Sequence, residues 1–448
     1  MTVVSEPQLP PDQIARLHRR GSELLPLASL THDGDEPPAE WVEALAALAD
    51  RLGQSYPFAD AQYLGQMLKP PHPVAWAGYA MAMLLNSNNH AFDGGPATAH
   101  LEREAVDQIA RMLHQETHLS HLTASGTIAN LEALWVARSL HPEKVVLSSA
   151  QAHYTHARIS EVVGARHETV PATAHGTLDL AALEERLQHG GVGTVVATLG
   201  STGLGVLDPV DRIADLCEEY AARLHVDAAY GGFFAILADG NAPGVARAPF
   251  DALARADSIA IDPHKHGLQP YGCGCIVFRD PSVGRFYNHD SPYTYFTSDE
   301  LHPGELSLEC SRSGAAAAAL WATLRALPLT RDGLGSHLAS TRSAAIALAA
   351  HIRQLDGWTL VLEPDLDIVC WYPTRTTASA VSAATDIAFQ QLAERGWHVA
   401  KLVISATDLG LEADQPTVTV LRSTLMKPEH AGIVDEFAGV LAALDLGV

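Results

Sequence analysis

The chain has 448 residues, which exceeds the length of one ordinary domain and predicts two or three folded units. Hydrophobic residues make up 47% of the chain and charged residues only 18%, a composition that excludes a disordered polypeptide. The formal net charge of -23 disfavours nucleic acids and anionic membranes as partners, because like charges repel.

The distribution of apolar residues and cysteines favours a cytoplasmic protein. The longest uncharged apolar stretch, 74–85, is shorter than the roughly 18 to 20 residues that a membrane-spanning helix needs. No basic segment precedes an apolar one at the N-terminus, so the sequence predicts no secretory signal. The five Cys are odd in number and scattered, which fits reduced thiols better than a disulfide framework.

Residues 1–65 are predicted to form an N-terminal helical arm. Two helical patterns, at 11–25 and 38–52, are separated by an acidic link that contains Gly and Pro. An arm of this size has little core of its own, so we expect it to pack on another domain or on another subunit.

Residues 66–325 are predicted to form a large α/β domain. Short apolar runs alternate with helical patterns, which is typical of a mostly parallel sheet. The expected strands are 118–123, 144–148, 194–198, 224–227, 258–261 and 274–278, and the clearest helices are 127–139 and 209–223. Functional residues of such a domain cluster at the strand ends.

Residues 326–448 are predicted to form a small α+β C-terminal domain, which follows an Ala-rich helix that begins near Gly314. Its expected strands are 367–371 and 417–421, and its expected helices are 379–396 and 430–444.

Lys265 is one of only five Lys in a chain with 29 basic residues. It follows a buried-looking strand and precedes a Gly-rich turn, where desolvation would favour the neutral amine. A neutral Lys is a nucleophile toward aldehydes. Taken alone, the residue also fits a Lys whose charge reaches solvent along its apolar stem.

Two further features stand at strand ends. The run at 224–227 ends in Asp227, and such an Asp either pairs with a protonated pyridine nitrogen or caps a turn. Another strand leads through Ser125, Gly126 and Thr127 into a helix, whose first N-H groups and dipole favour an anion, although a helix N-cap needs the same residue types. The motif of a nucleoside triphosphate loop is absent.

An anion site, a strand-end Asp and a strand-end Lys are together what the phosphate, ring nitrogen and aldehyde of pyridoxal phosphate require. The chain resembles the pyridoxal-phosphate-dependent group II amino-acid decarboxylases, which have the aspartate-aminotransferase-like fold (PLP fold type I). The resemblance covers roughly residues 60–440. It rests on five motifs in family order: Ser-Ala-Gln-Ala-His-Tyr-Thr (149–155), Ala-Thr-Leu-Gly-Ser-Thr (197–202), His-Val-Asp-Ala-Ala-Tyr-Gly-Gly (225–232), Asp-Pro-His-Lys (262–265) and Leu-Arg-Ser (421–423).

The resemblance implies which residues surround the cofactor: Gly126, Thr127, His153, Thr202, Asp227, Ala229, Asp262, His264 and Lys265. Lys265 would bond to the aldehyde, Asp227 would hold the pyridinium, and His153 would stack on the ring and either move a proton or bind the substrate carboxylate. Several relatives have an amide in place of Asp262. An acid beside the phosphate repels it unless backbone contacts orient the phosphate.

The resemblance also implies substrate contacts and a homodimer. Gln66 and His90 match regions that line the site in relatives, partly from the neighbouring subunit. Arg312 either clamps a carboxylate with its two-pronged guanidinium or makes a structural dimer contact. Tyr293 and Tyr295 lie where the family has a loop whose Tyr protonates the carbanion, and both also fit ordinary packing aromatics.

The activity implied is decarboxylation of an L-amino acid to the amine. Transamination, decarboxylation coupled to transamination and cleavage of a carbon-carbon bond use the same cofactor and remain alternatives, as does a non-catalytic protein of this fold. The 23 His do not predict a metal site. Two pairs, 118/121 and 153/156, are three residues apart, but no Cys or carboxylate completes either at ligand spacing.

Overall fold

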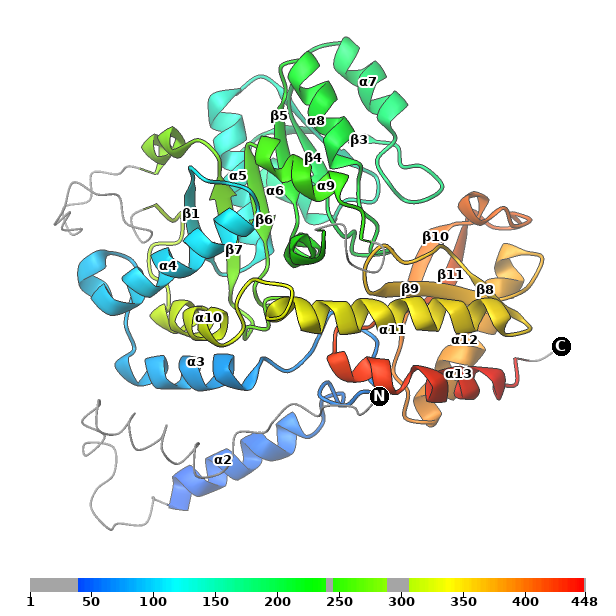
Figure 1. Ribbon diagram of the computed structural model, residues 1–448. Coiled ribbons are helices and arrows are strands. Elements are labelled where there is room, and N and C mark those ends of the chain that lie inside the picture. The colour runs from blue at the N-terminus through cyan, green and yellow to red at the C-terminus, as the bar shows by residue number, and fades with distance from the viewer. Residues whose placement is uncertain (1–38, 239–244, 288–305, 447–448) are drawn as a thin grey trace.

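The structure is a computed structural model that describes residues 39–238, 245–287 and 306–446. Within these residues, two sheets lie side by side, and the long helix α11 (Leu334–Gln354) passes along both (Figure 1). No helix among the described residues is both long and apolar enough to cross a bilayer.

The larger sheet has seven strands in the described part of the chain, in the order β1-β7-β6-β5-β4-β2-β3. Within it, β7 is antiparallel to β1 and β6, and the remaining neighbours are parallel. The strands are β1 (Leu119–Thr123), β2 (Val145–Ser149), β3 (Arg166–Val170), β4 (Val192–Thr198), β5 (Arg223–Asp227), β6 (Ser258–Ile261) and β7 (Gly274–Phe278). The predicted α/β fold with a mostly parallel sheet is confirmed.

Helices cover both faces of this sheet, because successive side chains of a strand point to opposite faces. On β6, Ala260 packs on helix α5, whereas Ile259 and Ile261 belong to the core cluster that contains α4 and α8. The helices of this domain are α4 (Pro96–Met112), α5 (Gly126–Leu140), α6 (Thr155–Val163), α7 (Leu180–Gln188), α8 (Val210–Glu219) and the short α9 (Ala248–Asp251). Single-turn or two-turn 3-10 helices complete it: η2 (Phe92–Gly94), η3 (Gly232–Leu237), η4 (Ala252–Arg255) and η5 (Pro281–Phe286).

The parallel strands all end at one edge of the sheet, which is where the site forms. The turns that follow β1, β2, β4, β5 and β6 therefore meet there, as they do in open α/β sheets. Strand β3 was not among the expected strands. It is an edge strand with the sequence Arg-His-Glu-Thr-Val, of which only Val170 is buried, so it lacks the apolar run of a central strand.

The smaller sheet is antiparallel, with the order β10-β11-β9-β8. Its strands are β8 (Trp358–Leu360), β9 (Ile368–Pro373), β10 (Ala400–Ser405) and β11 (Thr417–Thr424). Helices α11, α12 (Ala378–Glu394) and α13 (Val434–Ala442) pack on it, with η6 (Thr407–Leu409) and η7 (Pro428–Gly432) in the connections. Its core includes the fully buried Trp371, whose ring meets Phe437 edge to face. A small α+β unit was predicted here, but β8 and β10 were not.

The N-terminal helices lie apart from both sheets (Figure 1). Helix α3 (Pro73–Leu85) packs on the Ala-rich α10 (Gly314–Ala326) at close range, since a Cβ on Gly78 would lie 3.2 Å from the Cα of Ala319. Helix α2 (Ala39–Leu52) has no buried residue. The helix expected at 11–25 lies outside the described residues, and the domain boundaries at 65/66 and 325/326 stay predictions.

Candidate active site

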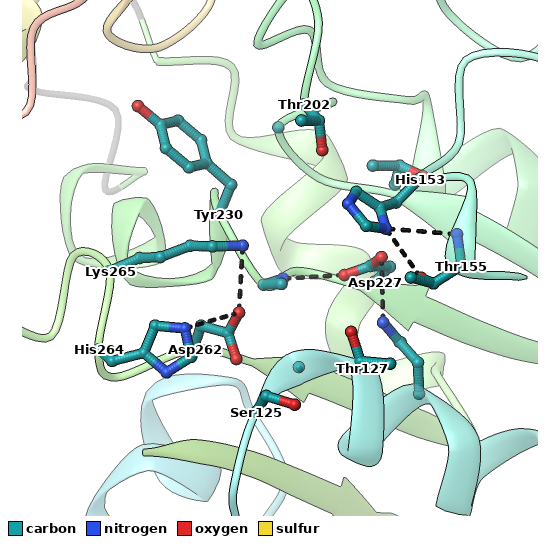
Figure 2. Close-up of a pocket in the computed structure, with 15 residues that line it drawn as sticks. Ser125, Thr127, His153, Thr155, Thr202, Asp227, Tyr230, Asp262, His264 and Lys265 are labelled. Atoms are coloured by element: carbon teal, nitrogen blue, oxygen red, sulfur yellow. Dashed lines mark hydrogen bonds and ion pairs between the residues drawn. The ribbon is translucent and has the colours of Figure 1, made fainter. Parts of the chain in front are cut away.

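A cavity of about 200 Å³ lies at the carboxyl-terminal edge of the larger sheet (Figure 2). The turns after β1, β2, β4, β5 and β6 supply its walls. It is lined by Ser125, Gly126, Thr127, Asn130, His153, Thr155, Thr198, Gly200, Thr202, Asp227, Ala229, Tyr230, Asp262, His264 and Lys265. The nine residues that the sequence placed around a cofactor all line this cavity, although they span 140 positions of the chain from Gly126 to Lys265.

The turn between β1 and α5 forms one wall. Ser125 is the N-cap of α5, and its Oγ accepts a hydrogen bond from the N-H of Ile128. The N-H groups of Gly126 and Thr127 precede the first intrahelical hydrogen bond, so they and the helix dipole can hold an anion. A Cβ on Gly126 would lie 2.6 Å from Oδ2 of Asp262. Only glycine therefore lets the Asp262 carboxyl approach this turn.

Asp227 ends β5 and is buried, with three N-H donors around its carboxylate. The N-H of Ala229 donates to Oδ1 at 3.1 Å, whereas His156 Nε2 and Asn130 Nδ2 donate to Oδ2 at 2.9 and 3.2 Å. Burial raises the pKa of Asp227, but the hydrogen bond from His156 and the nearby His156 and Lys265 outweigh it and hold the pKa well below its ordinary value. The carboxylate is therefore ionised and suited to a protonated ring nitrogen.

A second layer of polar side chains orients Asn130. Because Asn130 Nδ2 donates to Asp227, its Oδ1 accepts from His225 Nε2 at 2.7 Å. His225 Nδ1 in turn lies 2.9 Å from the Ser258 hydroxyl. Burial lowers the pKa of His225 to about 3, which keeps this histidine neutral and able to serve both contacts.

Sequence reasoning did not identify Asn130, His156 or His225, although two signals were available. His225 lies two residues before Asp227 on the same strand, and so on the same face of the sheet. Asn130 lies four residues after Gly126 on α5, so both residues share one face of that helix. For His156 no such spacing exists, because its contact with Asp227 joins α6 to β5.

Lys265 follows β6 and reaches the cavity from the side opposite to His153 and Thr155 (Figure 2). Its Nζ lies 3.1 Å from Asp262 Oδ2, and His264 Nε2 lies 3.5 Å from the same oxygen. Burial lowers the pKa of His264. The neutral Lys265 amine that the sequence predicted stays a prediction, and the structure places the Asp262 carboxyl group beside that amine.

His153 follows β2 and lies beside Thr155 at the rim of the cavity (Figure 2). The backbone N-H of Thr155 points at His153 Nδ1 at 3.4 Å, and the Thr155 hydroxyl lies 2.8 Å from that nitrogen. Since a backbone N-H only donates, Nδ1 is the acceptor and Nε2 carries the proton of the neutral ring. Burial lowers the pKa of His153, so the neutral ring is favoured at pH 7.

The structure does not bring the predicted substrate contacts into the cavity lining. Gln66 is exposed, and His90 packs on Gly94, where a Cβ would meet its ring at 2.6 Å. Arg312 forms a buried ion pair with Glu102 at 2.9 Å and also donates to the Leu122 carbonyl. Its charge is thus used within the chain, which favours the structural interpretation over the carboxylate clamp. Residues 293 and 295, the two candidate tyrosines, lie outside the described residues.

Arg422, in the Leu-Arg-Ser motif on β11, is a different case. Its Nε donates to the carbonyl of Gly203, which follows the cavity residue Thr202, and its Nη1 donates to the carbonyl of Gly65. The residue is buried, Nη2 has no hydrogen-bond partner among the described residues, and no carboxylate pairs with the guanidinium in that part of the chain. A buried, uncompensated guanidinium favours an anion.

Comparison with known proteins agrees with this geometry. A family model for the pyridoxal-dependent decarboxylase conserved domain matches residues 73–373. The chain is 29% identical to the L-aspartate decarboxylase of Thermococcus kodakarensis, covering 80% of this chain and 88% of that protein. It is 27% identical to the L-aspartate/L-glutamate decarboxylase of Pyrococcus horikoshii, covering 80% of this chain and 89% of that protein. It is 30% identical to a "Probable L-tyrosine/L-aspartate decarboxylase" of Methanothermobacter thermautotrophicus, covering 70% of this chain and 84% of that protein.

Solved structures share the fold at lower identity. The crystal structure of mouse CSAD matches with a TM-score of 0.78 at 21% identity, over 94% of this chain and 91% of that one. The crystal structure of Oryza sativa TDC with PLP and tryptamine matches with a TM-score of 0.79 at 19% identity, over 98% of this chain and 99% of that one. The predicted PLP fold type I is therefore confirmed.

Gly126→Ala is expected to weaken the binding of pyridoxal phosphate at least ~10-fold, because the new Cβ would overlap the Asp262 carboxyl and strain of about 1–3 kcal/mol follows. Absorbance titration of the cofactor-free protein measures this affinity. Gly439→Ala in α13 is the matched control, since a Cβ there meets nothing within 4 Å. Wild-type affinity in Gly126→Ala would show that this turn does not hold the phosphate.

Proposed function

Since the chain belongs to the pyridoxal-dependent decarboxylase family, we propose that the cavity at the strand ends is its active site, with Lys265, Asp227 and the Ser125–Thr127 turn as the cofactor contacts. The protein is a pyridoxal-phosphate-dependent carboxy-lyase that acts on an amino acid. The observation that carries the site proposal is the convergence of a helix N-terminus, an ionised Asp and a Lys on one cavity. The helix N-terminus would hold the phosphate, Asp227 the ring nitrogen and Lys265 the aldehyde.

Asp227 has the central electrostatic part in the reaction. When bound, pyridoxal phosphate supplies an electron sink for the pair of electrons that remains on Cα after the carboxylate leaves. Asp227 holds the proton on the ring nitrogen through a charge-assisted hydrogen bond, a type of contact that contributes about 1.5–3 kcal/mol. The donors His156, Asn130 and Ala229 keep this carboxylate ionised and oriented.

His153 is proposed to stack on the ring and to present its Nε2 proton on the substrate side. Thr155 fixes the imidazole through Nδ1, which leaves Nε2 free to donate to a carboxylate or to move a proton. Lys265 is proposed to bond to the cofactor aldehyde and, once the substrate amine replaces it, to act as a nearby amine base.

Arg422 is proposed to bind the substrate carboxylate, in place of Arg312. The Glu102 carboxylate already compensates Arg312, whereas the guanidinium of Arg422 donates only to the backbone carbonyls of Gly203 and Gly65 among the described residues. Those two carbonyls adjoin Thr202 and Gln66, so Arg422 connects the cofactor edge with one of the segments that the sequence placed near the substrate.

The proposed substrate is L-aspartate. The relatives from Thermococcus kodakarensis and Pyrococcus horikoshii carry aspartate in their names, alone or with glutamate, and the third relative carries it beside tyrosine. The uncompensated positive charge of Arg422 is compatible with a substrate of net negative charge. Decarboxylation at Cα would convert L-aspartate into β-alanine and carbon dioxide.

The proposed assembly is a homodimer in the cytoplasm. Trp41, Leu45, Leu48 and Leu52 form one apolar stripe along α2 and are each between 50% and 66% exposed. A helix with an apolar stripe and no buried residue in the described part of the chain is suited to a second subunit. All five Cys are free thiols, which supports a reducing compartment.

The reaction is tested by incubating the purified protein with L-aspartate, L-glutamate or L-tyrosine and measuring carbon dioxide, amine and keto acid separately. We expect equal amounts of carbon dioxide and β-alanine from L-aspartate, and at least ~1,000-fold less from Lys265→Ala, which lacks the nucleophile. Lys401→Ala, which removes an exposed ion pair with Asp386, is the matched control. Keto acid without carbon dioxide would contradict decarboxylation, and release of carbon dioxide from another substrate alone would contradict L-aspartate.

Two arginine variants are expected to fail in different ways. Arg422→Gln should lower kcat/KM about 10- to 100-fold, because a charge-assisted hydrogen bond of about 1.5–3 kcal/mol to the substrate is lost. Arg312→Gln should instead lower the free energy of unfolding by about 3–5 kcal/mol, since it leaves the Glu102 carboxylate buried without its partner. Steady-state kinetics and denaturant unfolding separate the two effects. An unchanged kcat/KM in Arg422→Gln would refute the assignment.

Leu45→Asp in α2 is expected to convert the homodimer into a monomer, because it places a charge in the apolar stripe. Light scattering on a sizing column measures the mass. Glu43→Gln lies on another face of the same helix and should leave the dimer intact. A wild-type protein that elutes as a monomer at micromolar concentration would contradict the proposed assembly.

A further inference from the structure

Asp262 places a carboxyl group against the turn that holds the proposed phosphate site. The residue is 3% exposed, and its Oδ2 and Oδ1 would lie 2.6 and 2.8 Å from a Cβ on Gly126. Oδ2 has Lys265 Nζ and His264 Nε2 nearby. Oδ1 is buried and has no hydrogen-bond partner among the described residues. One oxygen of this carboxyl group thus lies buried against the turn without a donor.

The charged and titratable groups around Asp262 come from several parts of the fold. Its own segment contributes Lys265 and His264, and the loop that follows contributes Tyr271 with the thiols Cys273 and Cys275, all three of which have raised pKa values. The start of α6 contributes the neutral His153. The β1–α5 turn itself has no titratable side chain, but Glu309 accepts a hydrogen bond from the N-H of Ala124 in this turn. The buried Glu102 raises the pKa of the two thiols.

These groups leave a bound phosphate with little fixed positive charge. A phosphate monoester carries a charge of about -1.5 to -2 at pH 7. Lys265 is the one Lys or Arg side chain in the cavity lining that the described residues supply, and its Nζ already lies 3.1 Å from Asp262 Oδ2, so its single charge cannot offset both the carboxylate and a phosphate dianion. A dianion at the Ser125–Thr127 turn would therefore lie next to an ionised carboxylate, and like charges at hydrogen-bond distance repel strongly.

We propose that Asp262 takes up one proton from solvent when the cofactor phosphate binds, and that this proton lies between Asp262 Oδ1 and a phosphate oxygen. The proposal rests on the proposed function, since it concerns the phosphate of the same cofactor. One O-H bond forms at Oδ1 as a solvent or buffer acid gives up the proton, and the net negative charge of the two anions falls by one. Oδ2 keeps its contacts with Lys265 Nζ and His264 Nε2. The oxygen without a partner thereby becomes a donor to the ligand.

Proton uptake makes the affinity for the phosphate depend on pH in a definite direction. Because the bound state holds one more proton than the separate partners, the Kd should rise about 10-fold for each pH unit above pH 8, where the free phosphate is a dianion. A carboxylate that stays ionised in the complex would instead leave the Kd nearly independent of pH in this range.

The test uses 4-deoxypyridoxine 5′-phosphate, which has the ring and the phosphate but a methyl group in place of the aldehyde. Lys265 cannot bond to this probe, so no proton from that reaction enters the measurement. Calorimetric titration of the full-length, cofactor-free protein at pH 8, in two buffers with different ionisation enthalpies, counts the protons taken up. We expect about one proton more for the wild type than for Asp262→Asn, whose amide donates without a proton from solvent.

Two matched variants locate the proton. Glu309→Gln neutralises the carboxylate that accepts from Ala124 at 2.8 Å on the same turn, and it should keep the full uptake. His264→Asn removes the other titratable neighbour of Asp262 and should also keep it. Loss of the uptake in His264→Asn with retention in Asp262→Asn would assign the proton to the histidine and overturn the proposal.

The wild type alone also decides the proposal if Asp262→Asn does not fold. A Kd for the phosphorylated probe that stays constant between pH 8 and pH 9.5 would overturn the proposal. A Kd that rises about 10-fold for each pH unit would support it, provided that the control compound, 4-deoxypyridoxine without the phosphate, shows no such rise. Failure of the wild type to bind either the probe or pyridoxal phosphate at any pH would be a distinct result. It would refute the cofactor site itself.

Discussion

The buried, ionised carboxylate of Asp227 is the interaction on which the rest of the site depends. A carboxylate at the end of a central strand has lost its water, and only dedicated donors can keep it charged. His156, Asn130 and the Ala229 N-H supply them, from α6, α5 and the turn after β5. The packing of both helices against one face of the sheet is therefore part of the electrostatics of the site. Because the charge is held before any ligand arrives, little reorganisation is needed during the reaction.

Asp262 shows how differently a second carboxyl group behaves in the same cavity. Asp227 has three N-H donors, whereas Asp262 has a buried oxygen with no partner in the described part of the chain and lies next to an expected anion. One environment surrounds the carboxylate with donors, and the other leaves an oxygen without one. Two carboxyl groups of one residue type are thus proposed to take different parts, one toward the ring and one toward the phosphate, because the groups around them differ.

The sequence allowed the fold and most of the cofactor side of the site to be predicted. Asp227 ends a strand, Gly126 and Lys265 follow shortly after one, and the position of a strand end follows from local apolar runs. Strand β3 could not be recognised in this way, because an edge strand with exposed side chains has no apolar run. On the substrate side, Arg312 was considered and Arg422 was not. The two arginines differ in the groups that surround the guanidinium. The sequence does not show this difference, because Glu102 lies 210 positions from Arg312 along the chain.

By itself, the sequence determined the class of chemistry: an anion site, an Asp and a Lys in the order and spacing that pyridoxal phosphate requires. Those features are local, since each depends on a strand end and on the residue type that follows it. Only the tertiary structure decided which carboxylate stays charged, which arginine is already neutralised and which oxygen lacks a donor. Desolvation and pairing decide these properties, and both depend on groups that distant segments bring within a few ångströms.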